Sequence, residues 1–560
     1  MAATSSGLPD VCIIGMGAAG ATAAYVLAEA GLRVLVLEAG RALDQRDARP
    51  DELMAAYTRG GYGPKFNQEL QTWRPGPEAE AVPATYSLGK MVNGVGGSTQ
   101  IYGTWMRRYQ PHDFLIRSST VARYGEDTLP PGANVVDWPL TYDDLEPYYC
   151  RVERLMGVAG VPGNVRGQPV PDGNPFEGYR GEPLPLPPPR RTPTGEMFTA
   201  AGRRLGYHPF PVPATINSQP YDGRPACTYC GWCTFYICHN DAKTTAGNSF
   251  AGKALATGRV ELRTGCRVVG INRGPSGRVE GVDYLDPDGR VRAQAAGRFV
   301  LAGYTFENVR LLLTSGIGNE HGQVGRNFMT KMYCSVLGLF PGQRLNRFVA
   351  PAACGDIMDD FVGDNFDHAG LGFVRGATIS CEEQLQPIGA ARMALPPGVP
   401  SWGRAYKAHL VESWNSIADL RVQPETLPYE DTFLDLDPRV RDRSGLGMPV
   451  IRITWDIHDN ERRMIDFVEE KTRRILAEMG AATVWTGSRF TGAGSAHDLG
   501  GCRMGTDPAG SVVDPALRVW ETPNLYVYGG AVFPSGGGIN PTLTIQALVW
   551  RAAEGLARGG

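Results

Sequence analysis

The sequence predicts an α/β fold that begins with a Rossmann-like nucleotide-binding unit. Residues 10–15 form a short apolar run typical of a buried strand, residues 18–29 an alanine-rich helix, and residues 33–38 a second strand. Near the other end of the chain, residues 524–528 indicate a strand and residues 541–556 a helix that is entered through Asn540. The order of strand, helix and strand predicts a parallel sheet covered by helices.

The turn after the first strand carries the pattern G-x-G-x-x-G. Gly15 permits a tight turn, Gly17 lets the backbone approach a phosphate, and Gly20 lets the helix pack closely on the strand. Glu38 follows at the end of the second strand, where an acidic side chain can accept hydrogen bonds from ribose hydroxyls. A glycine-rich turn alone can merely join a strand to a helix, but the complete unit favours dinucleotide binding.

The middle of the chain differs from its two ends in composition and in hydrophobic periodicity. Residues 41–90 and 116–225 are polar, rich in proline and weakly periodic, which predicts long loops and insertions on the substrate side. Residues 258–302 alternate apolar and polar and predict a small antiparallel layer, and residues 336–489 predict a mixture of helices and strands.

Composition limits the classes of function. The 560 residues contain 55 Lys and Arg against 58 Asp and Glu, a net charge of −3, which argues against a nucleic-acid partner and favours a small, uncharged or mildly acidic substrate. No apolar run is long enough to span a membrane, and residues 1–9 lack the pattern of a signal peptide. Eleven cysteines, an odd number, argue against a disulfide framework.

Several segments together resemble the glucose-methanol-choline (GMC) family of flavoprotein oxidoreductases. The similarity rests on the glycine turn with Glu38, on residues 93–99 (NGVGGST), on 497–501 (HDLGG) and on 540–544 (NPTLT). Within the family, the chain is most similar to flavoprotein subunits of bacterial gluconate, fructose and glucose dehydrogenases, through residues 139–149, 221–225 and 324–327.

The resemblance implies a Rossmann-like FAD-binding domain interleaved with an α+β substrate-binding domain, the GMC fold. It assigns residues 1–45, 85–115, 225–335 and 490–560 to the FAD-binding domain, and 46–84, 116–224 and 336–489 to the substrate-binding domain and its lid or insertions. The FAD is expected to be non-covalent, because Gln100, Ile101 and Tyr102 stand where some relatives have a histidine bonded to the flavin. The residues expected to bind FAD are Gly15, Gly17, Gly20, Glu38, Gly96, Gly97, Ser98, Val268, Gly530, Ala531 and Thr542.

The resemblance also implies a catalytic pair. His497 matches the family's catalytic histidine, and a neutral imidazole can accept the hydroxyl proton of an alcohol. Asn540 stands where relatives have histidine or asparagine and can orient the substrate oxygen. Taken singly, His497 is better interpreted as an ordinary loop histidine and Asn540 as a simple helix cap, but the pair at the family's spacing favours catalysis.

Four cysteines lie within twelve residues, at Cys227, Cys230, Cys233 and Cys238. Such clustered thiols suit an iron–sulfur cluster or a structural zinc ion, with free thiols or a disulfide as weaker alternatives. The resemblance implies a three-iron (3Fe-4S) cluster held by three of them, with Cys227 and Cys233 matching and Cys238 favoured over Cys230 as the third.

The resulting expectation is a dehydrogenase that oxidises an alcohol of a sugar, sugar acid or polyol and passes electrons through the cluster to a cytochrome c. The resemblance implies export with a small accessory subunit to a periplasmic, membrane-associated site, with a cytoplasmic location as the alternative. Other functions stay open: an oxidase that makes hydrogen peroxide, a flavin-containing lyase, or an electron-transfer subunit with a vestigial pocket.

Overall fold

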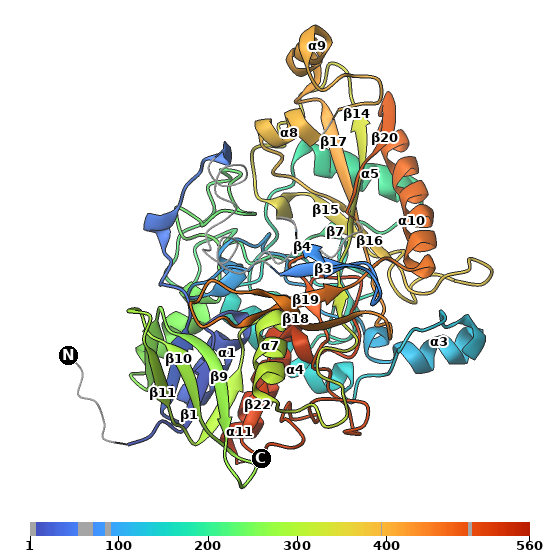
Figure 1. The fold of residues 1–560 in the computed structure, drawn as a ribbon. Helices are drawn as coiled ribbons and strands as arrows, with labels where there is room; N and C mark the ends of the chain where they lie inside the picture. Colours follow the sequence, from blue (N-terminus) through green and yellow to red (C-terminus); the bar gives the residue numbers. More distant parts are fainter. Residues whose placement is uncertain (1–6, 54–70, 85–90, 394, 491–494, 560) are drawn as a thin grey trace.

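The structure is a computed structural model that describes residues 7–53, 71–84, 91–393, 395–490 and 495–559 (Figure 1). Parts of the expected domain segments 46–84, 85–115 and 490–560 lie outside these described residues. The same is true of residues 1–6, which belong to the segment 1–9 on which the expectation of no signal peptide rests.

A parallel five-stranded sheet forms the base of the molecule, in the order β22-β12-β1-β2-β8 (Figure 1). Helix α1 (Ala18–Glu29) packs against α11 (Thr542–Ala557), so the two ends of the chain meet beside this sheet. Small side chains on α1 make the close packing possible, since Ala21, Ala23 and Ala24 are fully buried. The predicted α/β fold is therefore confirmed. The strands are β1 (Val11–Ile14), β2 (Val34–Glu38), β8 (Val260–Thr264), β12 (Arg298–Leu301) and β22 (Leu525–Val527).

The antiparallel layer is smaller than the sequence predicts. It contains β9 (Arg267–Arg273), β10 (Val279–Leu285) and β11 (Val291–Gln294). Strand β8, expected in the same layer, instead extends the parallel sheet by pairing with β2. The alternation of polar and apolar residues in β8 reflects its position at the edge of that sheet, where one face is partly exposed.

A six-stranded antiparallel sheet, in the order β20-β14-β17-β16-β15-β7, forms the upper part of the molecule. The long helix α10 (Asp459–Glu478) packs along it and contacts α5 (Pro193–Arg204). This agrees with the mixture of helices and strands predicted for residues 336–489. The strands are β7 (Phe210–Pro211), β14 (Tyr333–Leu339), β15 (Asp356–Met358), β16 (Ala377–Cys381), β17 (Ile417–Pro424) and β20 (Thr483–Phe490).

Residues 116–225 contain more regular structure than predicted. Besides α5, they form α3 (Ile116–Tyr124) and α4 (Tyr142–Met156). Helix α4 starts at a capping box in which the Thr141 hydroxyl accepts the amide of Asp144, and it ends at Gly157 in the left-handed region. The interpretation of this segment as loop was wrong, because flanking prolines and Pro147 within the helix masked its amphipathic period.

Short elements connect these layers. A four-stranded sheet in the order β18-β19-β3-β4 lies between the two large sheets in Figure 1, and its strands β3 and β4 come from the N-terminal part of the chain. These and the remaining elements are β3 (Thr72–Arg74), β4 (Val82–Pro83), β5 (Asn164–Val165), β6 (Gln168–Pro169), α6 (Gly252–Ala256), α7 (Thr305–Ser315), β13 (Met329–Thr330), α8 (Pro387–Met393), α9 (Gly403–Ser413), β18 (Phe433–Arg441), β19 (Pro449–Thr454) and β21 (Asp498–Leu499).

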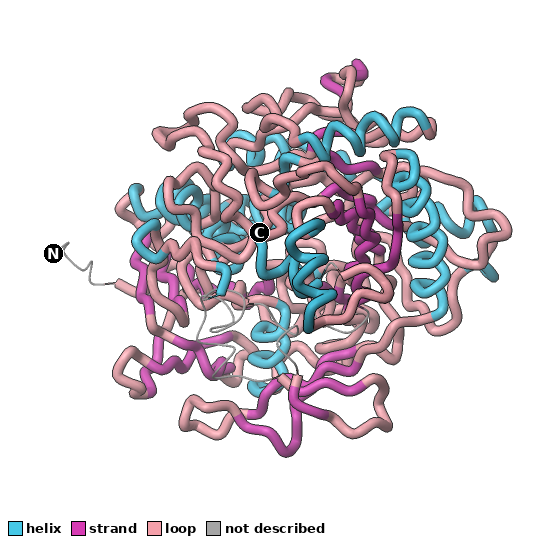
Figure 2. Tube along the Cα trace, turned by 90° about the horizontal axis from the view of Figure 1, so that it is seen from above, coloured by secondary structure: helices cyan, strands magenta, loops and turns pink. Residues whose placement is uncertain are grey.

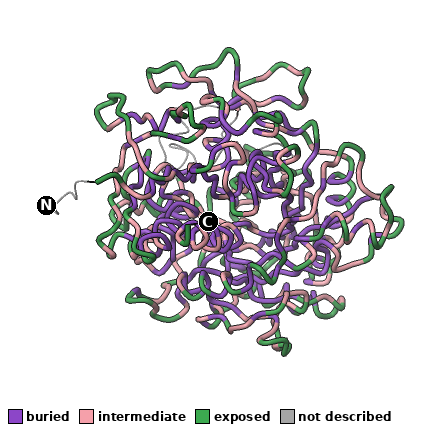
Figure 3. Tube along the Cα trace, turned by 90° about the horizontal axis from the view of Figure 1, so that it is seen from below, coloured by how far each residue is buried: buried purple, intermediate pink, exposed green. Residues whose placement is uncertain are grey.

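Views along the long axis show how the core is covered. From above, strands lie both near the middle and along the lower edge, with helices beside and between them (Figure 2). From below, buried segments fill the middle and exposed segments form the rim (Figure 3). Among the helices of the described residues, none has both the length and the apolar content needed to cross a membrane.

Candidate active site

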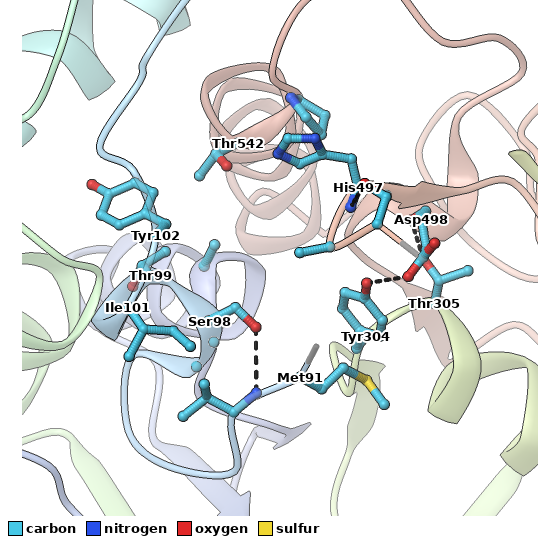
Figure 4. A pocket seen from close by; sticks show the side chains of 18 of the residues that line it. Met91, Ser98, Thr99, Ile101, Tyr102, Tyr304, Thr305, His497, Asp498 and Thr542 are labelled. Atoms are coloured by element: carbon cyan, nitrogen blue, oxygen red, sulfur yellow. Dashed lines mark hydrogen bonds between the residues drawn. The ribbon is translucent and has the colours of Figure 1, made fainter. Parts of the chain in front are cut away.

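A cavity of about 600 Å³ lies where the parallel sheet meets the six-stranded sheet. Segments from both ends and from the middle of the chain line it, and Figure 4 shows His497 and Thr542 on one side and Ser98 on the other. Of the residues predicted to bind FAD or to act in catalysis, the following line the cavity: Gly15, Gly17, Glu38, Gly97, Ser98, Val268, Gly530, Thr542, His497 and Asn540.

Three predicted cofactor residues do not line the cavity. Gly20 lies inside the turn, where a Cβ atom would come within 1.9 Å of the Gly15 carbonyl oxygen. Gly96, at φ +91°, donates its amide to the Met16 carbonyl at 2.8 Å. Ala531 is buried in the short 3-10 helix Gly530–Val532. These three residues therefore support the wall of the cavity from behind and do not line the cavity itself.

The glycine turn forms a cradle that suits a dinucleotide. A Cβ atom added at Gly17 would meet nothing nearer than the Gly97 Cα atom, at 3.9 Å, because this residue faces the open space. Helix α1 begins directly after it, so its free amides and the positive end of its dipole point at the same place. The Glu38 carboxylate is held at the end of β2 by the amides of Met16 and Gly40, at 2.7 and 2.8 Å. The residues present therefore fit the FAD that the sequence predicts.

His497 is held between two side chains. Its Nδ1 atom lies 2.7 Å from the Tyr333 hydroxyl, and its Nε2 atom lies 3.4 Å from the Asn540 amide nitrogen. Because that amide can only donate, Nε2 carries the lone pair and Nδ1 carries the proton. Burial raises the pKa of Tyr333, so its phenol stays neutral, and its oxygen accepts a hydrogen bond from Nδ1–H. The basic nitrogen thus faces Asn540 within the cavity.

Asn540 does not cap helix α11, which corrects the expected helix entry. The helix starts at Thr542 with Pro541 at its cap position, and no side chain makes a capping hydrogen bond there. The Asn540 Oδ1 atom is buried without a hydrogen-bond partner among the described residues. The side chain is therefore available to a ligand in the cavity, because its amide nitrogen points to His497 rather than to the helix.

Two further buried groups adjoin the pair, and sequence reasoning gave neither a role. Burial raises the pKa of the Asp498 carboxyl to about 7, and the Tyr304 hydroxyl donates a hydrogen bond to it (Figure 4). Burial lowers the pKa of Lys331 to about 7, and its Nζ atom donates to the carbonyls of Gly537 and Ile539, just before Asn540. No local sequence signal marks Lys331, whereas Asp498 directly follows the predicted base.

The four clustered cysteines lie on a loop beside the cavity, since Thr234 and Phe235 from the same loop line it. Cys233 is buried, the other three are partly exposed, and all four are free thiols. Within the described residues, no three side chains of His, Cys, Asp or Glu are arranged to hold a metal ion. The four thiols, all of them among the described residues, form no such group, so the iron–sulfur expectation rests on the sequence alone.

Comparison with known proteins identifies related sequences over the whole chain. Two models described as GMC oxidoreductase match residues 133–333 and 428–548, and one described as FAD dependent oxidoreductase matches residues 10–73. Gluconate 2-dehydrogenase flavoprotein from Pantoea cypripedii is 32% identical, over 98% of this chain and 93% of the relative. Paromamine 6'-oxidase from Streptomyces fradiae is 33% identical, over 98% and 91%.

A third relative and a solved structure extend the comparison. The fructose dehydrogenase large subunit from Gluconobacter japonicus is 29% identical, over 98% of this chain and 97% of the relative. The crystal structure of pyridoxine 4-oxidase from Mesorbium loti superimposes with a TM-score of 0.62 at 18% identity, over 98% of this chain and 99% of that one. That similarity supports the fold.

Proposed function

Because this chain belongs to the GMC oxidoreductase family and is an FAD-dependent enzyme acting on alcohol groups, we propose that it is a dehydrogenase of a sugar or related polyol with His497 as its base. The observation that carries the proposal is the pair of His497 Nε2 and Asn540 Nδ2, 3.4 Å apart in the cavity that also contains the glycine cradle. Oxidation of an alcohol removes one proton from oxygen and one hydride from carbon. Bound FAD supplies the two-electron acceptor for that hydride.

The side chains of the site accept the hydroxyl proton and position the substrate oxygen. His497 accepts the hydroxyl proton at Nε2, while Tyr333 keeps the ring oriented through Nδ1. The Asn540 amide holds the substrate oxygen beside that nitrogen, and Lys331 fixes the backbone that leads to Asn540. The start of helix α11 faces the cavity through Thr542, so its dipole favours negative charge there.

The test of this proposal is anaerobic flavin reduction measured by stopped-flow absorbance with a panel of sugars and polyols. We expect His497→Ala to bind FAD normally and to slow reduction by about 10²–10⁴-fold, the usual contribution of a general base. The matched control is His409→Ala on the distant helix α9, which leaves the rate unchanged. A His497→Ala rate within threefold of wild type refutes the assignment, and an enzyme whose substrate never bleaches the flavin is instead a lyase.

The electron acceptor is a separate part of the proposal. We propose that thiols of the 227–238 loop bind an iron–sulfur cluster, which makes the protein a dehydrogenase with a cytochrome c acceptor. The loop's position at the cavity supports this, because electrons must leave close to the flavin. Iron analysis and electron paramagnetic resonance of anaerobically purified protein test it. About three irons per FAD is the expected result, and iron-free protein whose bleached flavin recovers in air with peroxide formation is an oxidase.

The oxidase is the second candidate, and the 33% identity to paromamine 6'-oxidase favours it.

We also propose how the protein is assembled and how it holds its flavin. One relative is by its name the large subunit of fructose dehydrogenase, which supports a small accessory subunit for this chain as well. The periplasmic site that we propose rests on the sequence resemblance alone. The FAD is non-covalent in our proposal, so acid precipitation should release all of it into the supernatant.

A further inference from the structure

One wall of the cavity is made by the six-stranded sheet and is strongly polar. Alternate residues of a strand point to the same face, and three of them on β17, Asp419, Arg421 and Gln423, line the cavity. Glu382, directly after strand β16, lines it as well. We call these four residues the polar wall. No motif in the sequence marks them, and the reaction proposed above assigns them no part.

Two atoms of the polar wall are buried without a partner. Asp419 is 5% exposed and Gln423 is 2% exposed. Among the described residues, neither Asp419 Oδ1 nor Gln423 Nε2 has a hydrogen-bond partner. A buried polar atom without a partner costs about 1–3 kcal/mol, so such atoms are usually satisfied by something else. Here an acceptor and a donor face the same cavity, which indicates that a polar ligand completes them.

The charges of the polar wall do not balance. Arg421 Nη1 pairs with the Glu382 carboxylate, and Arg421 Nε lies 3.6 Å from Asp419 Oδ2. One guanidinium thus serves two carboxylates, which leaves an excess of one negative charge. Burial raises the pKa of the Glu382 carboxyl, so an additional cation beside this group would be favourable.

Neighbouring cations within the described part of the chain are already balanced. Arg347 also acts on Glu382 and donates to its backbone carbonyl, but the carboxylate with which it pairs is Glu383, at 3.8 Å. Lys331 lines the cavity but belongs to a buried network behind Asn540 that contains three acidic and three basic groups. That network consists of Asp113, Asp359, Glu425, Arg107, Arg375 and Lys331. With Arg347 counted against Glu383 and Lys331 counted within this network, the polar wall keeps an excess of one negative charge.

We propose that the polar wall selects an alcohol substrate that carries a protonated amine, an amino sugar or amino polyol. An ammonium group has three donors and one positive charge, so it can satisfy Asp419 Oδ1 and offset the excess charge at once. A hydroxyl satisfies the same atom without the charge. A substrate carboxylate would be repelled by Asp419 and Glu382, because Arg421 already pairs with these two residues. The inference rests on the proposed function and specifies its substrate class.

The first experiment compares three probes with the same ring and different charge: glucosamine, glucose and glucuronate. Binding is measured anaerobically by the perturbation of flavin absorbance, and kcat/KM by flavin reduction, at one pH and ionic strength at which the amine is protonated. We expect at least a tenfold preference for glucosamine over glucose, with glucuronate the poorest. Equal or reversed preference overturns the inference.

Variants then locate the preference on the polar wall. Asp419→Asn keeps the size of the side chain and removes the charge, so the preference for glucosamine over glucose should fall at least tenfold. The matched control, Glu470→Gln on the outer face of α10, removes one charge from an exposed pair and should leave the preference intact. A preference that survives in folded, FAD-loaded Asp419→Asn overturns the inference. If that variant does not fold, the ranking of the three probes by the wild type decides.

The two proposals fail in different ways. If none of the three probes bleaches the flavin and His497→Ala has no effect on any substrate, the proposed reaction fails. If the probes bleach the flavin in a manner that depends on His497 but show no preference for the amine, only the inference about the polar wall fails.

Discussion

The orientation of the His497 ring depends on a tyrosine from another part of the chain. Tyr333, at the start of β14, lies 2.7 Å from Nδ1 and leaves Nε2 toward Asn540. Without the phenol, Nδ1 loses the hydrogen bond to Tyr333 and the ring can rotate, so the base is less often in the productive orientation.

We therefore expect Tyr333→Phe to lower the rate of anaerobic flavin reduction by about tenfold or more, with unchanged FAD affinity. Stopped-flow absorbance gives the rate and fluorescence titration gives the affinity. The matched control is Tyr406→Phe, whose hydroxyl bonds a backbone carbonyl far from the cavity and whose loss should not matter. If both variants reduce flavin at the wild-type rate, Tyr333 does not position the base.

Asp498 predicts a pH dependence of stability. Its pKa rises from the ordinary 3.8 to about 7 on folding, because burial favours the neutral form. The folded protein therefore holds this proton more tightly than the unfolded chain. The resulting stability is fully present below about pH 4 and is lost as the pH rises through about 7, by at most about 4 kcal/mol.

Replacement of Asp498 by asparagine should remove that contribution. We expect the free energy of unfolding of Asp498→Asn to decline less steeply than that of wild type between about pH 4 and 7. Urea denaturation at several pH values measures it, with the exposed Asp466→Asn as control. Parallel pH profiles for Asp498→Asn and wild type would contradict the assignment.

Some site residues could be predicted and others could not, for a physical reason. His497 and the glycine turn belong to short contiguous motifs, so the sequence alone indicates them. Tyr333 and Asp419 reach the cavity from strands whose alternate residues face it, and their relevance depends on how the two sheets meet. Nothing in the local sequence encodes that arrangement.

At the scale of one element, two glycines of the turn have different roles: Gly20 is required for the fold, and Gly17 is required for dinucleotide binding. A Cβ atom at Gly20 would lie 1.9 Å from the Gly15 oxygen, so the backbone must shift. A Cβ atom at Gly17 has nothing nearer than Gly97 Cα, at 3.9 Å, and would enter the space for the dinucleotide. The two glycines therefore predict different defects.

We expect Gly20→Ala to lower the free energy of unfolding by about 1–3 kcal/mol or more. Gly17→Ala should leave the fold intact and weaken FAD binding at least tenfold. Urea denaturation of the FAD-free proteins and fluorescence titration with FAD measure the two quantities. The interpretation is wrong if Gly17→Ala destabilises the FAD-free protein as much as Gly20→Ala does.

Elements were predicted best where a short motif fixes them. Helix α1 has the predicted bounds, Ala18–Glu29, because Gly17 precedes it and Gly31 follows it at φ +90°. Strand β8 was assigned to the wrong sheet, because an edge strand of a parallel sheet has the same alternation as an antiparallel one. Which sheet a strand joins is decided by its neighbours in space.

At the scale of the whole molecule, the chain passes repeatedly between the two large sheets. The parallel sheet takes strands from both ends of the chain and from residues 260–301. This pattern agrees with two interleaved domains, although the boundaries given by the sequence stay a prediction. Buried ion pairs join such segments where they meet. Examples are the pairs of Arg107 with Asp359 and of Asp113 with Arg375.

Arg375 is the centre of one such junction and provides a test of how strongly the parts are coupled. The guanidinium is fully buried and binds Asp113 and Glu425, with a distance of 2.7 Å from Nε to the Glu425 carboxylate. Arg375→Ala removes the guanidinium that these two buried carboxylates share, which should lower the free energy of unfolding by about 3–5 kcal/mol.

The same variant shows whether the two parts unfold together. Because the network lies behind Asn540, we expect flavin release and loss of secondary structure to share one midpoint in urea, shifted equally by the substitution. Flavin fluorescence and circular dichroism follow the two events. The exposed pair of Arg462 with Asp459 provides the control, since Arg462→Ala removes a surface interaction of at most about 1 kcal/mol. Separate midpoints in Arg375→Ala would mean that the nucleotide-binding sheet keeps its fold and its flavin when the junction is lost.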